Sequence, residues 1–268
     1  MHVHFLDPYR PHDSPIHRLD PRVKFLLVLA FIFTNALVPV GAWPVYILLF
    51  ALVLSATLLS ELGVGYVLKR ASLAFPFVLA ALPLIFTLPG PVVLSLPAGP
   101  WTLTLSQPGL VRFASIALKS WISVQAAIVM AASTPFPDLL AAMRAVGIPR
   151  LLVAIFGLMW RYLFVLADEA LRLMRAREAR SGDAGLPGLR TGGSLAWRAR
   201  VTGGMAGNLF LRAFERSDRI YMAMLSRGYD GEVRALPLPR FGLLNGLILA
   251  AGLFTLIALL GLGFVFWA

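Results

Sequence analysis

Residues 241–267 form a long apolar run without a single charged side chain. About 20 apolar residues are enough for a helix to cross the hydrocarbon core of a bilayer, so this run predicts a transmembrane helix. The composition agrees: 59% of the 268 residues are hydrophobic and only 14% are charged. A typical soluble domain has about 25% charged residues. We therefore expect an all-α membrane protein.

Four more apolar runs precede this one, at residues 25–38, 45–59, 72–88 and about 110–133. Asp20 and Pro21 are suited to cap and begin the first helix. Residues 39–44 contain two prolines and a glycine and predict a tight turn. Residues 89–109 carry no charge and five prolines, which predicts a loop along the outer membrane interface. Together with residues 241–267, these runs predict five transmembrane helices.

The distribution of basic residues predicts the orientation. Cations gather before the first run and between the second and third: Arg10, Arg18, Arg22, Lys24, Lys69 and Arg70. Residues 38–44 and 89–109 carry none. Since basic residues concentrate on the cytoplasmic side, the N-terminus is expected in the cytoplasm, and four crossings return the chain there at Thr134. The C-terminus is then outside the cell.

Residues 151–166 are apolar enough to be another crossing, but charge argues against it. The following segment, 168–240, has thirteen arginines against eight acids and would then lie outside. Arg161 would also lie near mid-membrane, at a cost of about 2.5 to 3.5 kcal/mol. We predict instead that these residues begin a long cytoplasmic helix. The predicted domains are an N-terminal cytoplasmic arm (1–22), a four-helix membrane region (23–133), a cytoplasmic domain (134–240) and a last transmembrane helix (241–268).

Two predicted helices in the cytoplasmic domain end in the same pattern. One ends in Ala179-Arg180-Ser181 before a glycine-rich linker, and the other, from about residue 196 to 227, ends in Ser226-Arg227-Gly228. Helix capping explains a cation and a glycine at one such end. It does not explain why two ends share small residues on both sides of an arginine. Small neighbours let a partner approach closely, and a guanidinium suits carboxylates, which predicts insertion into acidic grooves of another protein.

The second of these helices is predicted to be amphipathic. Its apolar face is expected to contain Met205, Leu209, Ala213, Phe214, Tyr221, Met224 and Leu225, opposite Arg212, Glu215, Arg216, Asp218 and Arg219. Gly242 and Gly246 form a G-x-x-x-G step that can seat another helix. Met205, Leu209, Phe214 and these two glycines are the predicted packing residues.

Several chemistries find no support in the sequence. No lysine follows a glycine-rich phosphate loop, and no nucleophile elbow, HExxH motif or carboxylate pair within a predicted transmembrane helix is present, so no catalytic, cofactor or metal residues are predicted. There is no cysteine. The net charge of +11 is explained by cytoplasmic segments better than by nucleic acid. For His2, His4, His12 and His17 we prefer the interpretation that they are solvated polar residues over a role in binding metal. For Lys119 we prefer a side chain that snorkels or pairs with a partner over a role in transport.

Residues 215–231, ERSDRIYMAMLSRGYDG, resemble the transmembrane (T) components of energy-coupling factor (ECF) transporters, in particular the cobalt-type, CbiQ-like members. Residues 13–24, DSPIHRLDPRVK, fit the opening of that family. The resemblance implies a membrane part and a coupling domain of one short helix, at 136–147, and two long crossed helices. Each of two Ala-Arg-Gly-type motifs would dock in one of two ATP-binding subunits. That role carries over to Arg180 with its neighbours Ala179 and Ser181, where glycine is expected at 181, and to Arg227 with Ser226 and Gly228.

The resemblance further implies a non-catalytic subunit in the inner (plasma) membrane. ATP and magnesium would be bound by the partner subunits, as a homo- or heterodimer, and the substrate, cobalt or nickel, by a separate CbiM-like S component. A T component for a vitamin, a stand-alone permease using Lys119 and Arg112, and a basic membrane adaptor are the alternatives.

Overall fold

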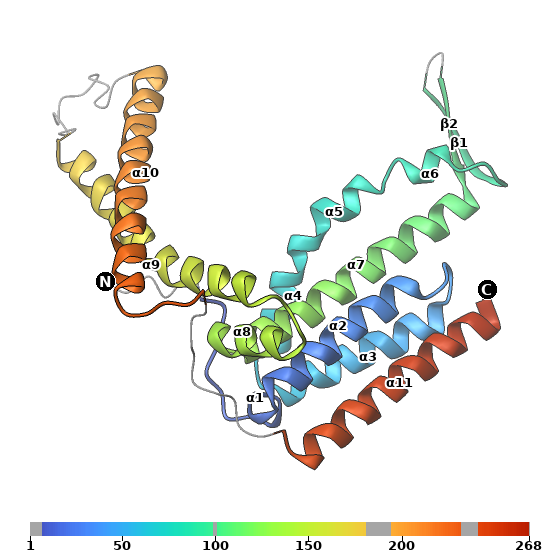
Figure 1. The fold of residues 1–268 in the computed structure, drawn as a ribbon. Coiled ribbons are helices and arrows are strands. Elements are labelled where there is room, and N and C mark those ends of the chain that lie inside the picture. Colours follow the sequence, from blue (N-terminus) through green and yellow to red (C-terminus); the bar gives the residue numbers. More distant parts are fainter. Residues whose placement is uncertain (1–6, 99–100, 181–193, 232–240, 268) are drawn as a thin grey trace. The chain divides into compact units, whose positions relative to one another are not determined.

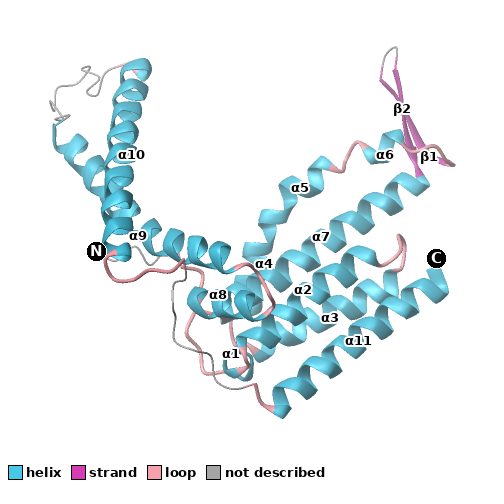
Figure 2. Cartoon of the chain, viewed as in Figure 1, coloured by secondary structure: helices cyan, strands magenta, loops and turns pink. Residues whose placement is uncertain are grey.

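The computed structural model describes residues 7–98, 101–180, 194–231 and 241–267. Nearly all of this part is helical, as Figure 2 shows. The elements are α1 (Pro15–Arg18), α2 (Pro21–Leu37), α3 (Trp43–Leu59), α4 (Val64–Ala71), the 3₁₀ turn η2 (Ser72–Ala74), α5 (Phe75–Ala80), α6 (Leu84–Thr87), β1 (Val92–Ala98), β2 (Trp101–Ser106), α7 (Gln107–Ser133), α8 (Phe136–Ala145), α9 (Arg150–Arg180), α10 (Leu195–Leu225) and α11 (Leu243–Trp267).

The prediction of an all-α membrane protein is confirmed. Among the described residues, four stretches are long and apolar enough to cross a membrane: Val64–Thr87, α7, α9 and α11. α2 and α3 have 17 residues each, the lower end of the range for a crossing of about 17 to 25. Because α9 meets the same criterion of length and composition, its place in the cytoplasm rests on charge and stays a prediction.

Local sequence explains where the helices begin. The Asp20 carboxylate accepts a hydrogen bond from the Arg22 backbone N–H at 2.8 Å, and Pro21 occupies the first turn of α2, as predicted. The third apolar run is not one smooth helix. It is interrupted by η2 and by a turn before α6, where Pro76 lies in the first turn of α5 and Pro83 precedes α6. Proline lacks the N–H that would continue the helix.

Residues 89–109 hold more structure than the predicted loop. β1 and β2 pair as an antiparallel hairpin, with a register shift between Val92 and Leu94. In Figure 1 the hairpin stands where α6 ends and α7 begins. It is the one exception to the helical prediction in the part of the chain that the structure describes.

Four helices, α2, α3, α7 and α11, pack side by side and are called the membrane bundle here (Figure 1). The core of the bundle consists of Phe31, Val38, Ala42, Val45, Tyr46, Leu49, Val53, Ile122, Ala126 and Leu256. α11 approaches α2 closely: a Cβ atom added to Gly252 would lie 2.5 Å from Cδ2 of Leu27. A small residue at this point lets the two helix backbones come together.

The chain divides into two compact units. Of the described residues, one unit comprises 147–180 and 194–231, with α9 and α10, together with Asp7; the other comprises 8–98, 101–146 and 241–267. We call α9 and α10 the helix pair. α8, which we expected beside the long coupling helices, packs on α2 in the unit of the membrane bundle. The predicted boundary at residue 134 separates membrane from cytoplasm, which a division into compact units does not test, so it stays a prediction.

Candidate functional site

The C-terminal end of α10 presents Arg227 on a rigid turn. Gly228 has φ +79°, its N–H donates to the Leu225 carbonyl at 3.0 Å, and the Tyr229 N–H donates to the Met224 carbonyl at 3.0 Å. These two bonds form a Schellman motif, which satisfies the last carbonyls of a helix and favours glycine at the left-handed position. The structure thereby accounts for the glycine of the Ser226-Arg227-Gly228 motif by backbone geometry.

The guanidinium of Arg227 is available to a partner. Ser226, Arg227 and Gly228 are all exposed. No described residue forms a hydrogen bond or ion pair with the Arg227 side chain. A cation on a fixed turn without an internal partner can be inserted into an acidic groove at little conformational cost.

The end of α9 shows a similar exposure. Ala179 and Arg180 are exposed, and Arg180 is the last residue of the helix. Ser181 lies outside the described residues. Residues 151–166 and 167–180 form one continuous helix, as predicted, so Arg180 ends a helix of 31 residues.

The half-buried face of α10 differs from the predicted one. Its members recur every three or four residues: Val201, Met205, Leu209, Ala213, Arg216, Ile220 and Met224. Phe214, Tyr221 and Leu225 are exposed instead, at 60%, 53% and 45%. The placement of Arg216 opposite this face was wrong, because its cation is compensated by Glu169 of α9. The Arg216 Nη2 lies 2.8 Å from Glu169 Oε2.

Gly242 and Gly246 do not seat a helix of the described chain. Nothing lies within 4 Å of a Cβ added at Gly242, and only the Phe241 ring, at 3.6 Å, approaches Gly246. The close contacts of α11 occur at Gly252, against Leu27, and at Gly263, against Val38, Pro39 and Val45. The sequence analysis missed these two positions.

Lys119 has an internal role. Its ammonium donates hydrogen bonds to the Ala36 and Val38 carbonyls at the end of α2, and the Asn35 side chain donates to the Lys119 carbonyl at 2.8 Å. The cation therefore caps one helix end from a neighbouring helix. Lys24 similarly donates to the Ser133 carbonyl at the end of α7, at 2.9 Å. These contacts argue against a transport path lined by Lys119.

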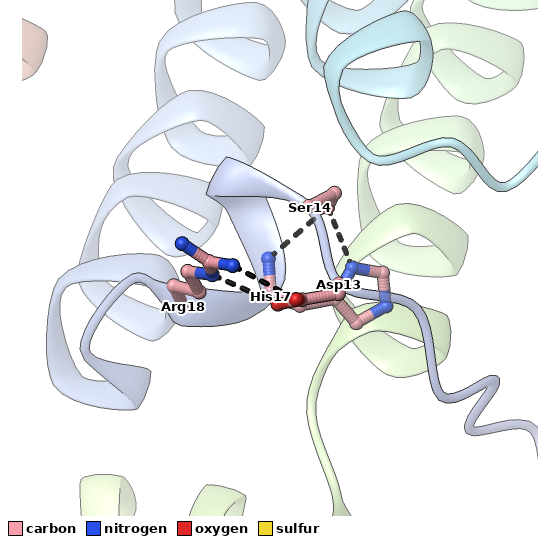
Figure 3. Close-up of polar contacts among 4 residues, drawn as sticks. All are labelled: Asp13, Ser14, His17 and Arg18. Atoms are coloured by element: carbon pink, nitrogen blue, oxygen red, sulfur yellow. Dashed lines mark hydrogen bonds and ion pairs between the residues drawn. The ribbon is translucent and has the colours of Figure 1, made fainter.

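Polar contacts among its own residues shape the N-terminal arm, and the Arg10 N–H donates to the Ala132 carbonyl of α7 at 2.9 Å. Figure 3 shows Arg18 paired with Asp13 through two 2.8 Å hydrogen bonds, and His17 beside Ser14. The two ring nitrogens of His17 contact the Ser14 hydroxyl at 2.7 Å and the Arg10 carbonyl at 3.0 Å. Because both nitrogens are engaged, His17 is not presented as a metal ligand.

No group of three metal-binding side chains occurs among the described residues. His2 and His4 lie outside them. The pKa of the Asp13 carboxyl is lowered by its hydrogen bonds to Arg18. Partial burial lowers the pKa of His17, to which Lys24 and His12 add repulsion.

The comparison with known proteins agrees with this architecture. The chain is 30% identical over 213 residues to a cobalt transport protein CbiQ of Rhodobacter capsulatus, covering 80% of each chain. It is 29% identical over 236 residues to an energy-coupling factor transporter transmembrane protein EcfT of Lactococcus lactis subsp. cremoris, covering 83% of each. For a cobalt transport protein CbiQ of Salmonella typhimurium the identity is 29% over 226 residues, with 82% and 95% covered.

The family model described as CbiQ, cobalt transport protein, matches residues 12–237. The match includes the second half of the N-terminal arm, most of the membrane helices, α9, α10 and both arginine motifs, and it ends before α11. Since this is well over half of the sequence, the chain belongs to the CbiQ family of cobalt transport proteins.

Proposed function

We propose that this chain is the transmembrane coupling subunit of an ECF-type importer. In this role it transmits movement of two ATP-binding subunits to a substrate-binding S component, and ATP and magnesium are bound by the partners. The observation that carries the proposal is the exposed Arg227 on its Schellman turn, without a partner among the described residues. Arg180, exposed at the end of α9, supplies the second contact.

The exposed apolar side of α10 supports a second partner surface. Phe210 and Phe214 are 68% and 60% exposed, and their rings stack with centroids 6.5 Å apart. Tyr221 and Met222 are also largely exposed. Large apolar side chains in such numbers mark a protein–protein or membrane contact. We assign this surface to the S component, to which Met205 and Leu209 contribute only as half-buried neighbours.

The proposed substrate is cobalt, with nickel as the alternative metal and a vitamin as the alternative class. The description of the family and the names of the Rhodobacter and Salmonella relatives support cobalt. In this proposal the S component selects the substrate. Uptake of labelled cobalt and nickel by cells that express the chain with its neighbouring subunits decides between the two metals.

The coupling role is tested by Arg227→Ala, with Arg219→Ala as the control. Arg219 is an exposed arginine on the same helix, two turns before the motif. Removing one partner of a buried charge contact costs about 2 to 5 kcal/mol, so Arg227→Ala is expected to weaken binding of the ATP-binding subunits about 30-fold or more. Arg219→Ala is expected to bind and transport normally. Normal co-purification and uptake in Arg227→Ala would refute the role.

A further inference from the structure

The two long helices meet at a buried charge instead of an apolar core. Among the described residues of α9 and α10, only Ala154 and Glu169 are buried. Two arginines of α10 surround the Glu169 carboxylate: Arg216 Nη2 lies 2.8 Å from Oε2, and Arg212 Nη1 lies 3.7 Å from Oε1. Arg216 is the more enclosed of the two, with 31% of its side chain exposed against 61% for Arg212.

A second polar contact fixes the direction of the helices. Arg177 Nη1 donates to the Thr202 hydroxyl at 3.1 Å. Moving forward along α9 from Glu169 to Arg177 therefore means moving backward along α10 from Arg216 to Thr202. The C-terminal half of α9 therefore runs in the opposite sense to α10, and the two helices cross obliquely in Figure 1.

A buried ion pair is a poor way to gain stability. Desolvation of both charges offsets their attraction, and an apolar pair of similar volume is often neutral or more stable. An apolar side chain at position 216 would fit its surroundings, because Arg216 occupies a face otherwise formed by Leu209, Ala213, Ile220 and Met224. The best-attested use of such a pair is to fix one register between helices.

The ion pair lies at the same sequence distance from each of the two arginine motifs. Arg180 lies eleven residues after Glu169, and Arg227 lies eleven residues after Arg216. At 1.5 Å per residue, each motif is about 16 Å along its helix from the ion pair. Because the two helices run in opposite senses, Arg180 and Arg227 lie on opposite sides of the ion pair.

We propose that Glu169 and Arg216 form the pivot of the coupling helices. These two positioning residues hold α9 and α10 at one register, so that force on Arg180 and Arg227 turns the helices against each other instead of sliding them. Arg212 supports Glu169 from the more exposed side. The inference rests on the proposed function and names the point through which that subunit transmits the movement.

The test replaces the pair by an apolar one, Glu169→Met with Arg216→Met, in the complete transporter in proteoliposomes. The control is Glu215→Met with Arg219→Met, the same change of composition at two exposed positions of α10. Thermal stability, ATP hydrolysis and substrate uptake are measured together. We expect the pivot variant to assemble, hydrolyse ATP and keep its melting temperature, while uptake per ATP falls about fivefold or more. The control is expected to keep the native ratio.

Native uptake per ATP in the pivot variant overturns the inference. If that variant loses stability, Arg216→Lys decides instead, because lysine keeps the charge but lacks the planar fork that reaches the carboxylate. A lowered uptake per ATP at native melting temperature supports the pivot, and an unchanged ratio contradicts it. The Arg227→Ala experiment separates this from the proposed function: if Arg227→Ala abolishes assembly while the pivot variant transports normally, only the pivot fails.

Discussion

The membrane bundle and the helix pair are both made of long helices, yet different forces hold them. In the bundle, Val45, Tyr46 and Leu49 of one helix are almost fully buried, and glycine at 252 lets α11 approach α2. In the helix pair, α10 has no buried residue among those described, and the central contact is the ion pair between Glu169 and Arg216. Close packing of side chains thus holds the helices of the membrane bundle together, and a charge contact holds α9 against α10.

This difference suits the two proposed tasks. A closely packed interior resists deformation, because displaced side chains lose many small contacts at once. A pair of helices that is joined by a few polar contacts and has few buried side chains can change its angle without losing a core. A scaffold in lipid benefits from the first property, and a subunit that must rock between partners benefits from the second.

The bundle side of this comparison predicts the largest effect, at Gly252. The Leu27 methyl group can move aside for alanine, but leucine adds further atoms where α11 meets α2. Overpacking typically costs about 1 to 3 kcal/mol, so Gly252→Leu should clearly lower the melting temperature in detergent. Gly261→Leu is the control, since nothing lies within 4 Å of its added Cβ. Equal melting temperatures for the two variants would show that packing at α2 does not hold the bundle.

The helix pair predicts a smaller, local effect at the motif of Arg227. Gly228 has φ +79°, where an L side chain costs about 1 to 2 kcal/mol, so Gly228→Ala should open the Schellman turn. Amide exchange at Tyr229, whose N–H bonds to Met224, should speed up about fivefold or more. The same substitution at Gly207, inside α10 with open space around it, should stabilise the helix by about 0.5 to 1 kcal/mol. Slower or unchanged exchange at Tyr229 in Gly228→Ala would contradict the cap.

Features set by neighbouring residues could be predicted from the sequence. Asp20 and Pro21 begin α2, and the apolar runs become helices, because caps and hydrophobic periodicity act within one or two turns. The interruption near Pro76 and Pro83 has a local cause in proline chemistry, but it was not predicted, because residues 72–88 were interpreted as one run. The hairpin at β1 and β2 also had a local signal, an alternation of apolar and polar residues in WTLTLS, that the abundance of proline concealed.

Features set by distant partners could not be predicted in the same way. Arg216 was placed on the polar face because arginine is normally solvated. The carboxylate of Glu169, 47 residues earlier, offsets the cost of half-burying its cation. Likewise α11 contains several glycines, and the bulk of Leu27 on another helix decides that Gly252 is a packing position while Gly246 is not. The exposure of Arg227 agrees with the sequence analysis, but its docking partner remains a proposal.

The smallest expected effect is a pH dependence where the arm meets the membrane bundle, at the hydrogen bond from the Arg10 N–H to the Ala132 carbonyl. Partial burial, with repulsion from Lys24 and His12, lowers the pKa of His17 below its ordinary value near 6.5, although the Arg10 carbonyl and Glu61 act in the other direction. The unfolded arm therefore binds more protons just below pH 6.5, and attachment of the arm weakens as the pH falls through that window. The Asp13 carboxyl, whose pKa is lowered by Arg18, contributes only at more acidic pH.

The measurement is amide exchange at Arg10, whose N–H bonds to the Ala132 carbonyl at 2.9 Å. After correction for the intrinsic rate, protection in the native chain should fall between pH 7.5 and 5.5, two values chosen about one unit on either side of the ordinary histidine pKa. His17→Gln keeps a donor and an acceptor but cannot titrate, so its protection should be flat. An equal slope in both proteins would assign the pH dependence to another group. A flat native profile would mean that the arm is held by the stacking of Arg10 on Tyr66, 3.7 Å from the ring centre, and by backbone bonds alone.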